Sequence, residues 1–325
     1  MILLTGVAGF IGSHVARVLL DAGHTVIGVD SINDYYDPAL KHARLGMLEG
    51  RAGFTFQRID IADRAAMRAL GERYPDMDAI IHLAAQAGVR YSIDNPYAYL
   101  DSNLAGQMTM LELARHARGL RHFVYASSSS VYGNDTSAPF ALDARCDKPV
   151  SLYAATKRAG ELLAHSYAEL YAIPATGLRF FTVYGPWGRP DMAYFSFTRN
   201  ILESRPIKVF NNGDLKRDFT YIDDIVAGVI AALETPPQHA PGGAAPHRVF
   251  NLGNHRPVKL LDFITAIETA AGKKAVMEMT GMAPGDVYET CADITESQKI
   301  LGFEPKTTLE SGIPKFVDWY RDFYK

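Results

Sequence analysis

The stretch ILLTGVAGFIG, residues 2–12, carries most of the information about the fold. It begins as a short apolar strand, and a Gly-x-x-Gly-x-x-Gly pattern at Gly6, Gly9 and Gly12 follows without a break. Glycines at this spacing permit a tight turn and the close approach of a pyrophosphate, whose charge the N-terminus of the next helix stabilises. We therefore expect a strand, a phosphate-binding turn and a helix that runs to about Asp21.

The next apolar segment, residues 25–29, predicts a second strand that ends at Asp30, eighteen residues after Gly12. A carboxylate at this place accepts hydrogen bonds from an adenosine ribose and repels a 2′-phosphate, so the sequence favours NAD over NADP. Lys41 and Arg44 soften that preference, although we expect them to lie in a loop as solvated charges.

Further strands are expected at residues 54–59, 79–83, 122–126 and 175–181, with helical segments such as 97–117 between them. Repeated alternation of strand and helix predicts a parallel, doubly wound α/β sheet of the Rossmann type. Ligands of such sheets bind at the carboxyl ends of the strands. The candidate NAD-binding residues at these ends are Gly6, Gly9, Phe10, Ile11, Gly12, Asp30, Asp60, Ile61, Leu83, Ala84 and Ala85, together with Tyr153 and Lys157.

The character of the chain changes after residue 181, where turn-rich segments and shorter elements follow. Helices are expected at residues 223–233, 260–271 and 308–324. We expect an NAD-binding Rossmann domain of residues 1–178 plus about 215–255. A smaller C-terminal α/β substrate domain would comprise residues 179–214 and 256–325.

Tyr153 and Lys157 stand four residues apart in a segment of helical character that runs to about Ala172. This spacing puts both side chains on one face of a helix, one turn apart. A nearby cation stabilises a phenolate and lowers its pKa, so we expect Lys157 to make Tyr153 a usable general base.

The bulk properties exclude several classes of protein. A formal charge of −3 and a pI near 6.4 provide no basic field for nucleic acid. Cys146 and Cys291 are the two cysteines, which offers neither a disulfide framework nor a metal-ligand cluster. The sequence shows no signal peptide and no apolar run of membrane-spanning length, so we expect a cytoplasmic protein without a metal, a membrane or a nucleic-acid partner.

With these residues in hand, the chain resembles the extended short-chain dehydrogenase/reductase superfamily and its NAD-dependent epimerase/dehydratase family along nearly its whole length. The glycine pattern, Asp30, Ser128 and the Tyr153–Lys157 pair carry that resemblance. Within the superfamily, the segments at residues 34–37, 85–92 and 181–191 are similar to those of UDP-glucuronate 4-epimerases. The resemblance implies a tightly held NAD that oxidises carbon 4 of a UDP-sugar; the bound 4-keto sugar then turns over and is reduced on its other face.

The resemblance also implies the roles of individual residues. Ser128 would bond the same sugar oxygen as Tyr153, and Asn103 is similar to an asparagine that bends its helix. Arg189 and Thr182 are candidates for holding a sugar carboxylate, with Arg90 as a weaker one; the alternative for Arg189 is a structural ion pair with Asp191. The candidate substrate-binding residues are Gly88, Val89, Arg90, Ser127, Ser128, Ser129, Thr182, Arg189, Val209, Phe210, Asn211, Arg217 and Asp286.

Several functions remain compatible with the sequence at this point. Relatives that eliminate water or decarboxylate a glucuronate carry an acidic residue immediately before the Val-Tyr-Gly, where this chain has Ser130. That difference favours simple epimerisation over 4,6-dehydration, and Arg189 with Thr182 favours UDP-glucuronate as the substrate. The alternatives are a UDP-glucose or UDP-N-acetylhexosamine 4-epimerase, a UDP-glucuronate decarboxylase, and a non-catalytic module that senses NAD. Met282 and its neighbours stand where relatives often have a polar contact to the nucleotide. The resemblance also implies a homodimer formed by the helices near residues 97–117 and 151–172.

Overall fold

A seven-stranded parallel sheet forms the centre of the protein in this computed structural model, which describes residues 1–134, 136–238, 243–282 and 287–325. The strand order is β11-β6-β5-β4-β1-β2-β3, with every neighbouring pair parallel. The strands are β1 Ile2–Thr5, β2 Val26–Asp30, β3 Phe54–Arg58, β4 Ala79–His82, β5 His122–Ser128, β6 Ala175–Phe180 and β11 His247–Leu252. The predicted doubly wound fold is confirmed, and β11 is a strand that the sequence analysis did not identify.

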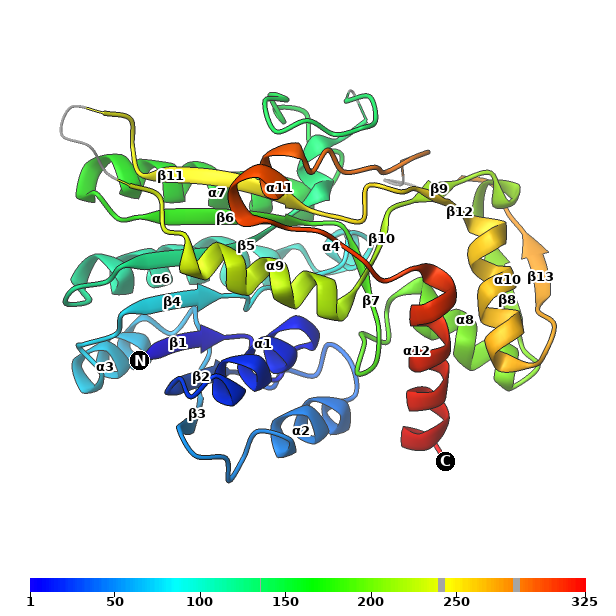
Figure 1. Cartoon of the computed structure of the whole chain (residues 1–325), viewed down its shortest axis with the longest axis horizontal. Helices are drawn as coiled ribbons and strands as arrows, with labels where there is room; N and C mark the ends of the chain where they lie inside the picture. Colours follow the sequence, from blue (N-terminus) through cyan, green and yellow to red (C-terminus); the bar gives the residue numbers. More distant parts are fainter. Residues whose placement is uncertain (135, 239–242, 283–286) are drawn as a thin grey trace.

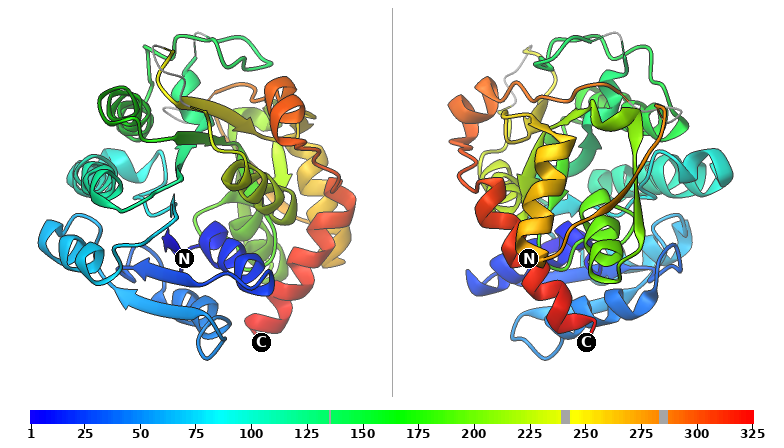
Figure 2. Two further views of the ribbon diagram at one scale, coloured as in Figure 1. Left: turned by 60° about the vertical axis from the view of Figure 1, so that its left-hand side comes forward. Right: turned by 90° about the vertical axis from the view of Figure 1, so that its right-hand side faces the viewer.

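Helices cover both faces of the sheet (Figures 1 and 2). On one face lie α3 Arg64–Arg73, α6 Gly106–His116 and α7 Leu152–Tyr171. On the other face α1 Phe10–Asp21 packs against α9 Ile222–Glu234, with α2 Pro38–Gly46 beside α1. Figure 2 shows this arrangement with the sheet seen nearly end-on.

The C-terminal half adds a smaller group of elements at one end of the sheet (Figure 1). Three two-stranded sheets occur there: β7 Thr182–Tyr184 with β10 Phe219–Tyr221, β8 Pro206–Val209 with β13 Val276–Met279, and β9 Lys216–Arg217 with β12 Val258–Lys259. The helices are α8 Ala193–Leu202, α10 Leu260–Ala271, α11 Thr295–Leu301 and α12 Leu309–Phe323. One continuous apolar core runs from α1 and α9 to α8, α10 and α12, so this group packs firmly on the sheet.

The segment between β4 and β5 departs from the single helix expected at residues 97–117. It contains α4 Tyr91–Asp94, α5 Pro96–Tyr99 and the π-helical η1 Leu100–Ala105 before α6 begins. Asn103, which is buried in η1, bonds both backbone groups of Gln86 and donates to Oγ1 of Thr156 at 3.0 Å. A widened turn of this kind bends a helix, and here it anchors α7 to the loop that follows β4.

The expectation of solvated Lys41 and Arg44 in a loop is wrong. Both lie on α2 and are buried, with 6% and 0% of their surface exposed. The helix begins because Asp37 caps it, accepting a hydrogen bond from the backbone N–H of Ala39 at 2.9 Å, and because Pro38 occupies its first turn. The Asp-Pro pair was the signal for this helix in the sequence.

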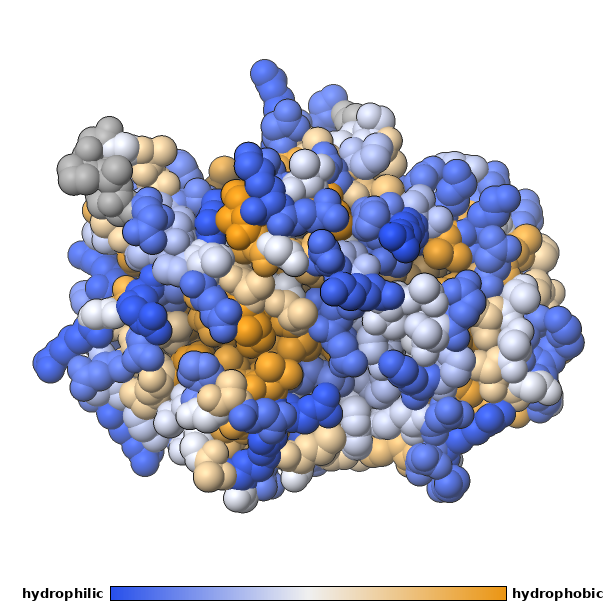
Figure 3. All heavy atoms as spheres, viewed as in Figure 1, coloured by the Kyte–Doolittle hydropathy of each residue, from blue (hydrophilic) through white to orange (hydrophobic). Residues whose placement is uncertain are grey.

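The outer surface on the side of α1 and α9 carries both apolar and polar side chains. In Figure 3 apolar side chains gather over these two helices, and polar residues dominate the rest of the face. Within the described ranges, no helix combines the length and the apolar character that crossing a bilayer requires.

Candidate active site

A cavity of about 1260 Å³ lies along the carboxyl ends of strands β1 to β6 and extends toward α8 and β8. It contains most of the candidate residues. The cofactor candidates that line it are Gly6, Gly9, Phe10, Ile11, Gly12, Asp30, Asp60, Ile61, Leu83, Ala84, Ala85, Tyr153 and Lys157. The substrate candidates that line it are Gly88, Val89, Arg90, Ser127, Ser128, Ser129, Thr182, Arg189, Phe210 and Arg217.

The glycine turn at one end of the cavity has the shape that a dinucleotide requires. A Cβ on Gly12 would lie 2.0 Å from the carbonyl oxygen of Gly6, and one on Gly9 would lie 2.9 Å from the same atom. Helix α1 begins at Gly9 without a side-chain cap, which leaves its first N–H groups for an anion. These features fit the pyrophosphate of NAD.

Asp30 lies beside this turn at the end of β2. Its Oδ2 accepts a hydrogen bond from the N–H of Ala8 at 3.0 Å, and its Oδ1 accepts one from the N–H of Ile32 at 2.9 Å. A carboxylate has further acceptor capacity on both oxygens, so Asp30 can also take the two hydroxyls of a ribose. Asp60 and Ile61 follow β3 along the same edge and supply a polar and an apolar wall.

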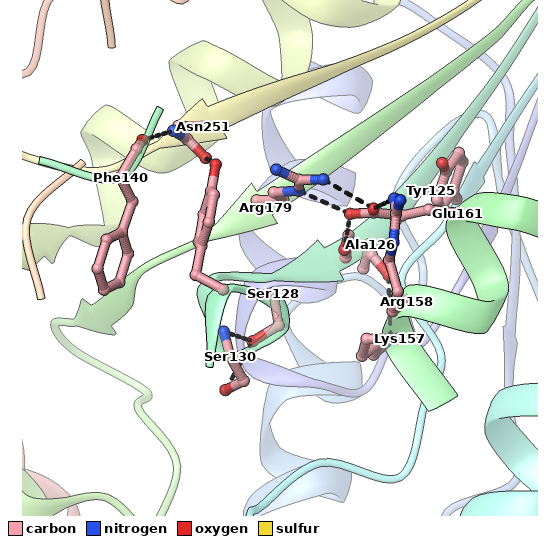
Figure 4. A network of polar contacts seen from close by, with 12 residues as sticks. Tyr125, Ala126, Ser128, Ser130, Phe140, Lys157, Arg158, Glu161, Arg179 and Asn251 are labelled. Atoms are coloured by element: carbon pink, nitrogen blue, oxygen red, sulfur yellow. Dashed lines mark hydrogen bonds and ion pairs between the residues drawn. The ribbon is translucent and has the colours of Figure 1, made fainter. Parts of the chain in front are cut away.

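Tyr153 and Lys157 project from the first turns of α7 into the middle of the cavity, opposite Ser128 at the end of β5. The Nζ of Lys157 donates to the carbonyl oxygen of Ala126 at 3.0 Å (Figure 4). Burial, with a contribution from the charge of Arg189, lowers the pKa of Lys157 to about 8.

The pKa of Tyr153 differs from the expectation. Burial raises it, and the groups that oppose this rise are a hydrogen bond with Ser128 and the positive charge of Arg189. Lys157 is not among these groups. The groups that stabilise a Tyr153 phenolate are therefore a serine from β5 and an arginine from a distant loop, which no local spacing in the sequence reveals.

Arg189 forms an ion pair with Asp191 on the far wall of the cavity. Its Nε lies 3.1 Å from Oδ1 and its Nη2 lies 2.5 Å from Oδ2 of that carboxylate. Burial opposes the charge of Arg189, but Asp191 outweighs it and raises the pKa of the guanidinium further. Tyr35 donates to Asp191 at 3.3 Å and also lines the cavity. The ion pair of Arg189 with Asp191 that the sequence left open is therefore present, and Tyr35 joins it as a residue that was absent from the expected site.

At the other end, Arg90 stacks over the ring of Phe210, 4.5 Å from its centroid. Arg217 lines the cavity nearby and donates to the carbonyl oxygen of Tyr288 at 3.0 Å. In the part of the chain that the structure describes, Val209 and Asn211 do not reach the cavity wall: Val209 is fully buried in the core and Asn211 bonds the carbonyl of Asp214. Asp286 lies outside the described residues.

The serine run at residues 127–130 makes two separate sets of hydrogen bonds. Ser127 donates its hydroxyl to Oε1 of Glu161 at 2.6 Å, which ties the end of β5 to α7. Ser128 bonds the N–H and the hydroxyl of Ser130, each at 3.2 Å, where the chain enters the 3₁₀ turn η2 Ser129–Tyr132. The serine run is therefore an ordered wall of the cavity.

Glu161 is the centre of a buried ionic network behind this wall (Figure 4). It is 1% exposed and accepts hydrogen bonds from Nε and Nη2 of Arg179 at 2.8 and 2.9 Å and from Arg158 at 2.7 Å. Burial alone would raise the pKa of Glu161, but the hydrogen bonds and charge of Arg179 bring it below its ordinary value.

We expect Glu161→Ala to destabilise the protein by about 3–5 kcal/mol at neutral pH, because it leaves the buried Arg179 charge without a partner. Urea unfolding measures the loss. Arg158→Ala is the control: its side chain is 28% exposed and its removal should cost less than about 1 kcal/mol. Since the folded pKa of Glu161 lies below the unfolded value, its contribution is present at neutral pH and declines as the pH falls through the folded pKa. Equal stabilities of the two variants would contradict this account.

Comparisons with known proteins agree with this geometry. A model of the NAD dependent epimerase/dehydratase family matches residues 2–253. UDP-glucuronate 4-epimerase 3 of Arabidopsis thaliana is 49% identical over 332 residues, covering 99% of this chain and 77% of that protein. The probable UDP-glucuronate 4-epimerase of Rhizobium meliloti is 47% identical and covers 99% of this chain and 97% of its own. The crystal structure of UDP-glucuronic acid 4-epimerase from Bacillus cereus with UDP-glucuronic acid and NAD has a TM-score of 0.90 and 35% identity, over 99% of both chains.

The parallel sheet, the glycine turn and the grouping of Tyr153, Lys157 and Ser128 define a member of the short-chain dehydrogenase/reductase superfamily. Such enzymes use a nicotinamide cofactor, and the turn in this chain fits one. The chain belongs to the NAD dependent epimerase/dehydratase family, whose model matches well over half of its length.

Proposed function

We propose that this protein is an NAD-dependent nucleotide-sugar 4-epimerase that interconverts UDP-glucuronate and UDP-galacturonate. The observation that carries the proposal is the guanidinium of Arg189, which lines the same cavity as Tyr153 and Thr182. Asp191 takes Nε and one N–H of Nη2, and the edge formed by Nη1 and the other N–H of Nη2 is left to bind the carboxylate of a glucuronate. The named relatives support the same substrate.

The chemistry begins at carbon 4 of the sugar. We assign Tyr153 to accept the proton of the 4-hydroxyl and Ser128 to hold the same oxygen by a hydrogen bond. When bound, NAD supplies the reversible hydride acceptor for carbon 4. Lys157, on the same helical face, is assigned to the ribose next to the nicotinamide and keeps positive charge near the reacting oxygen. Return of the proton from Tyr153 completes the reaction after the sugar has turned over.

The 4-keto sugar must be protected from a side reaction. A 4-keto-glucuronate is a β-keto acid, and it loses carbon dioxide when its carboxylate stands perpendicular to the carbonyl plane. We assign Arg189 and Thr182 to hold the carboxylate away from that orientation. Asp191 occupies the Nε edge of Arg189, so the edge of Nη1 and Nη2 would bond the sugar carboxylate through two N–H groups, and the Thr182 hydroxyl would donate a third bond. Ser129 and Ser130 place no acid beside carbon 5, which supports epimerisation over elimination of water.

At the nucleotide end of the cavity, the side chains are suited to binding a diphosphate and a base. Arg217 is assigned to the diphosphate, Arg90 and Phe210 to the uridine, and Gly88 and Val89 to the backbone wall beside them. On this proposal the substrate domain comprises residues 179–214 and 256–325, and residues 1–178 with about 215–255 bind NAD.

We further propose a homodimer formed by the helices on the α6–α7 face. Large apolar side chains are exposed on this face, with Tyr97 73%, Leu162 54% and Leu170 69% exposed. Burying such side chains against a second copy stabilises a dimer by removing apolar area from water. Sedimentation equilibrium should give twice the chain mass of 35.7 kDa. A Leu170→Glu variant should shift this mass toward that of the monomer, and a monomeric parent protein would contradict the proposal.

The free thiols of Cys146 and Cys291 are buried and unpaired. Free cysteines fit the reducing cytoplasm, which is the location we propose.

The test is to incubate the purified protein with UDP-glucuronate, without added NAD, and to follow the products by proton NMR. Appearance of UDP-galacturonate without carbon dioxide or pentose is the expected result and shows that the protein retains NAD. UDP-xylose or a 4-keto pentose would instead indicate a decarboxylase. No reaction even with NAD supplied would favour a neutral-sugar epimerase, and UDP-glucose is then the substrate to try.

A further inference from the structure

Arg44 is among the largest fully buried side chains of the described residues, and its charge has no role in the proposed chemistry. It lies on α2, and within the described residues no carboxylate forms an ion pair with it. Burying a cation without an anion is costly unless every N–H finds an acceptor. Arg44 meets that condition with oxygens from three separate segments.

The first of these segments is the glycine turn and the last is the loop that precedes Arg189. The Nη1 of Arg44 donates to the carbonyl oxygen of Ala8 at 3.2 Å. Its Nε and Nη2 donate to the carbonyl of Trp187 at 3.0 and 2.7 Å, and Nη2 also donates to the carbonyl of Gly188 at 2.9 Å. One rigid guanidinium therefore fastens the cofactor turn to the two residues that immediately precede Arg189.

The backbone at Trp187 is strained, so hydrogen bonds from outside the loop are needed to stabilise it. Trp187 has a φ of 63°, in the left-handed region that a bulky side chain disfavours. The three hydrogen bonds from Arg44 to the carbonyls of Trp187 and Gly188 stabilise that conformation. The N–H of Arg189 is fixed in turn by donation to the hydroxyl oxygen of Tyr194 at 3.0 Å.

The same short segment of chain also holds the other end of Arg189. Tyr36 accepts from Nη1 of Arg44 at 2.6 Å, and the neighbouring Tyr35 donates to Asp191, the ion-pair partner of Arg189. Asp30, just before this segment, bonds the N–H of Ala8, whose carbonyl accepts from Arg44. A continuous path of hydrogen bonds thus connects the ribose-binding carboxylate to the backbone of the sugar-binding arginine.

We propose that Arg44 is a positioning residue that sets the place of Arg189 and so controls whether a bound 4-keto-glucuronate is epimerised or decarboxylated. The inference rests on the proposed function. When the clamp is misplaced, the bond between carbons 5 and 6 breaks and carbon dioxide leaves. The electron pair passes to the 4-keto oxygen and carbon 5 takes up a proton, which yields UDP-4-keto-pentose. UDP-pentose would form if the hydride that carbon 4 gave to the nicotinamide cofactor were returned before release. Lysine at position 44 has one donor group in place of the planar fork and cannot bond all these carbonyls together.

The test compares Arg44→Lys with Leu45→Ala, the next residue of α2, which is buried and whose apolar side chain donates no hydrogen bond to the 187–188 loop. In Arg44→Lys we expect the fraction of product that appears as pentose to rise at least about tenfold, with a smaller loss in total turnover. Leu45→Ala should lower the melting temperature yet keep the product ratio of the parent protein. An unchanged ratio in Arg44→Lys, or an equal rise in both variants, overturns the proposal. If the lysine variant does not fold, Tyr36→Phe replaces it, because this change removes one acceptor oxygen of Arg44. We expect a smaller rise in the pentose fraction in that variant. An unchanged product ratio in folded Tyr36→Phe then overturns the proposal.

A binding measurement separates this inference from the proposed function. Calorimetry gives the preference of each variant for UDP-glucuronate over UDP-glucose. Loss of that preference in Arg44→Lys and its retention in Leu45→Ala support the positioning role, and an unchanged preference overturns it. If the parent protein makes no UDP-galacturonate, the proposed function fails, and this preference alone decides the role of Arg44.

Discussion

The variant Tyr153→Phe loses about 10³-fold in kcat with UDP-glucuronate, the size of effect expected when a general base is removed. Only one oxygen is lost, so the ring contact with Tyr99 and the packing of α7 remain. Without the phenol, no other group of the cavity is assigned to take the proton of the 4-hydroxyl. Ser128 has an ordinary hydroxyl and already bonds Ser130. Rate measurement under saturating substrate shows the loss directly.

The matched control is Tyr167→Phe, which removes a hydroxyl from the same helix. That hydroxyl bonds Glu112 at 2.6 Å, away from the cavity, so activity should stay within about twofold of the parent protein. Both variants should retain bound NAD, measured by absorbance after denaturation. Substantial turnover by Tyr153→Phe would remove Tyr153 from the mechanism.

The features that could be predicted from the sequence are those encoded over short distances. Gly6, Gly9 and Gly12 predict the turn because only glycine tolerates the contacts that a Cβ would make there. The alternation of apolar strands with helices predicts a parallel sheet, and the doubly wound fold follows. Tyr153 and Lys157 share a helix, so their spacing predicts that they point to one side.

The features that the sequence did not disclose depend on contacts between distant segments. Arg44 and Trp187 are separated by 143 residues, and Tyr35 and Asp191 by 156. A charged residue in a polar segment is usually solvated, so Lys41 and Arg44 were expected at the surface. The 187–188 carbonyls take the guanidinium of Arg44, and the carbonyl of Asn33 takes the ammonium of Lys41, which only the folded chain shows. Lys157 was expected to lower the pKa of Tyr153; burial raises it instead, and the positive charge that opposes the rise is that of Arg189 from this loop.

We expect Arg189→Ala to lower kcat/KM for UDP-glucuronate by about 10²-fold and to release some UDP-pentose. A hydrogen bond to a charged group contributes about 1.5–3 kcal/mol, and a bidentate pair provides more than one such bond. The variant also removes positive charge beside Tyr153, which raises the pKa of the phenol further and slows proton transfer. The pentose separates the two effects, because only a loosened carboxylate accounts for loss of carbon dioxide.

Arg189→Lys is the matched variant, since it keeps the charge near Tyr153 but loses the planar fork. It should restore part of the rate while still releasing pentose, because a single ammonium group does not fix the orientation of the carboxylate. Product analysis by proton NMR and trapped carbon dioxide measures both quantities in one reaction. Unchanged kinetics and no pentose in Arg189→Ala would mean that Arg189 serves only as the ion-pair partner of Asp191. A loss of rate without pentose would instead mean that Arg189 acts on the charge of the reacting phenol. The carboxylate would then be held by another residue, such as Thr182, which also lines the cavity.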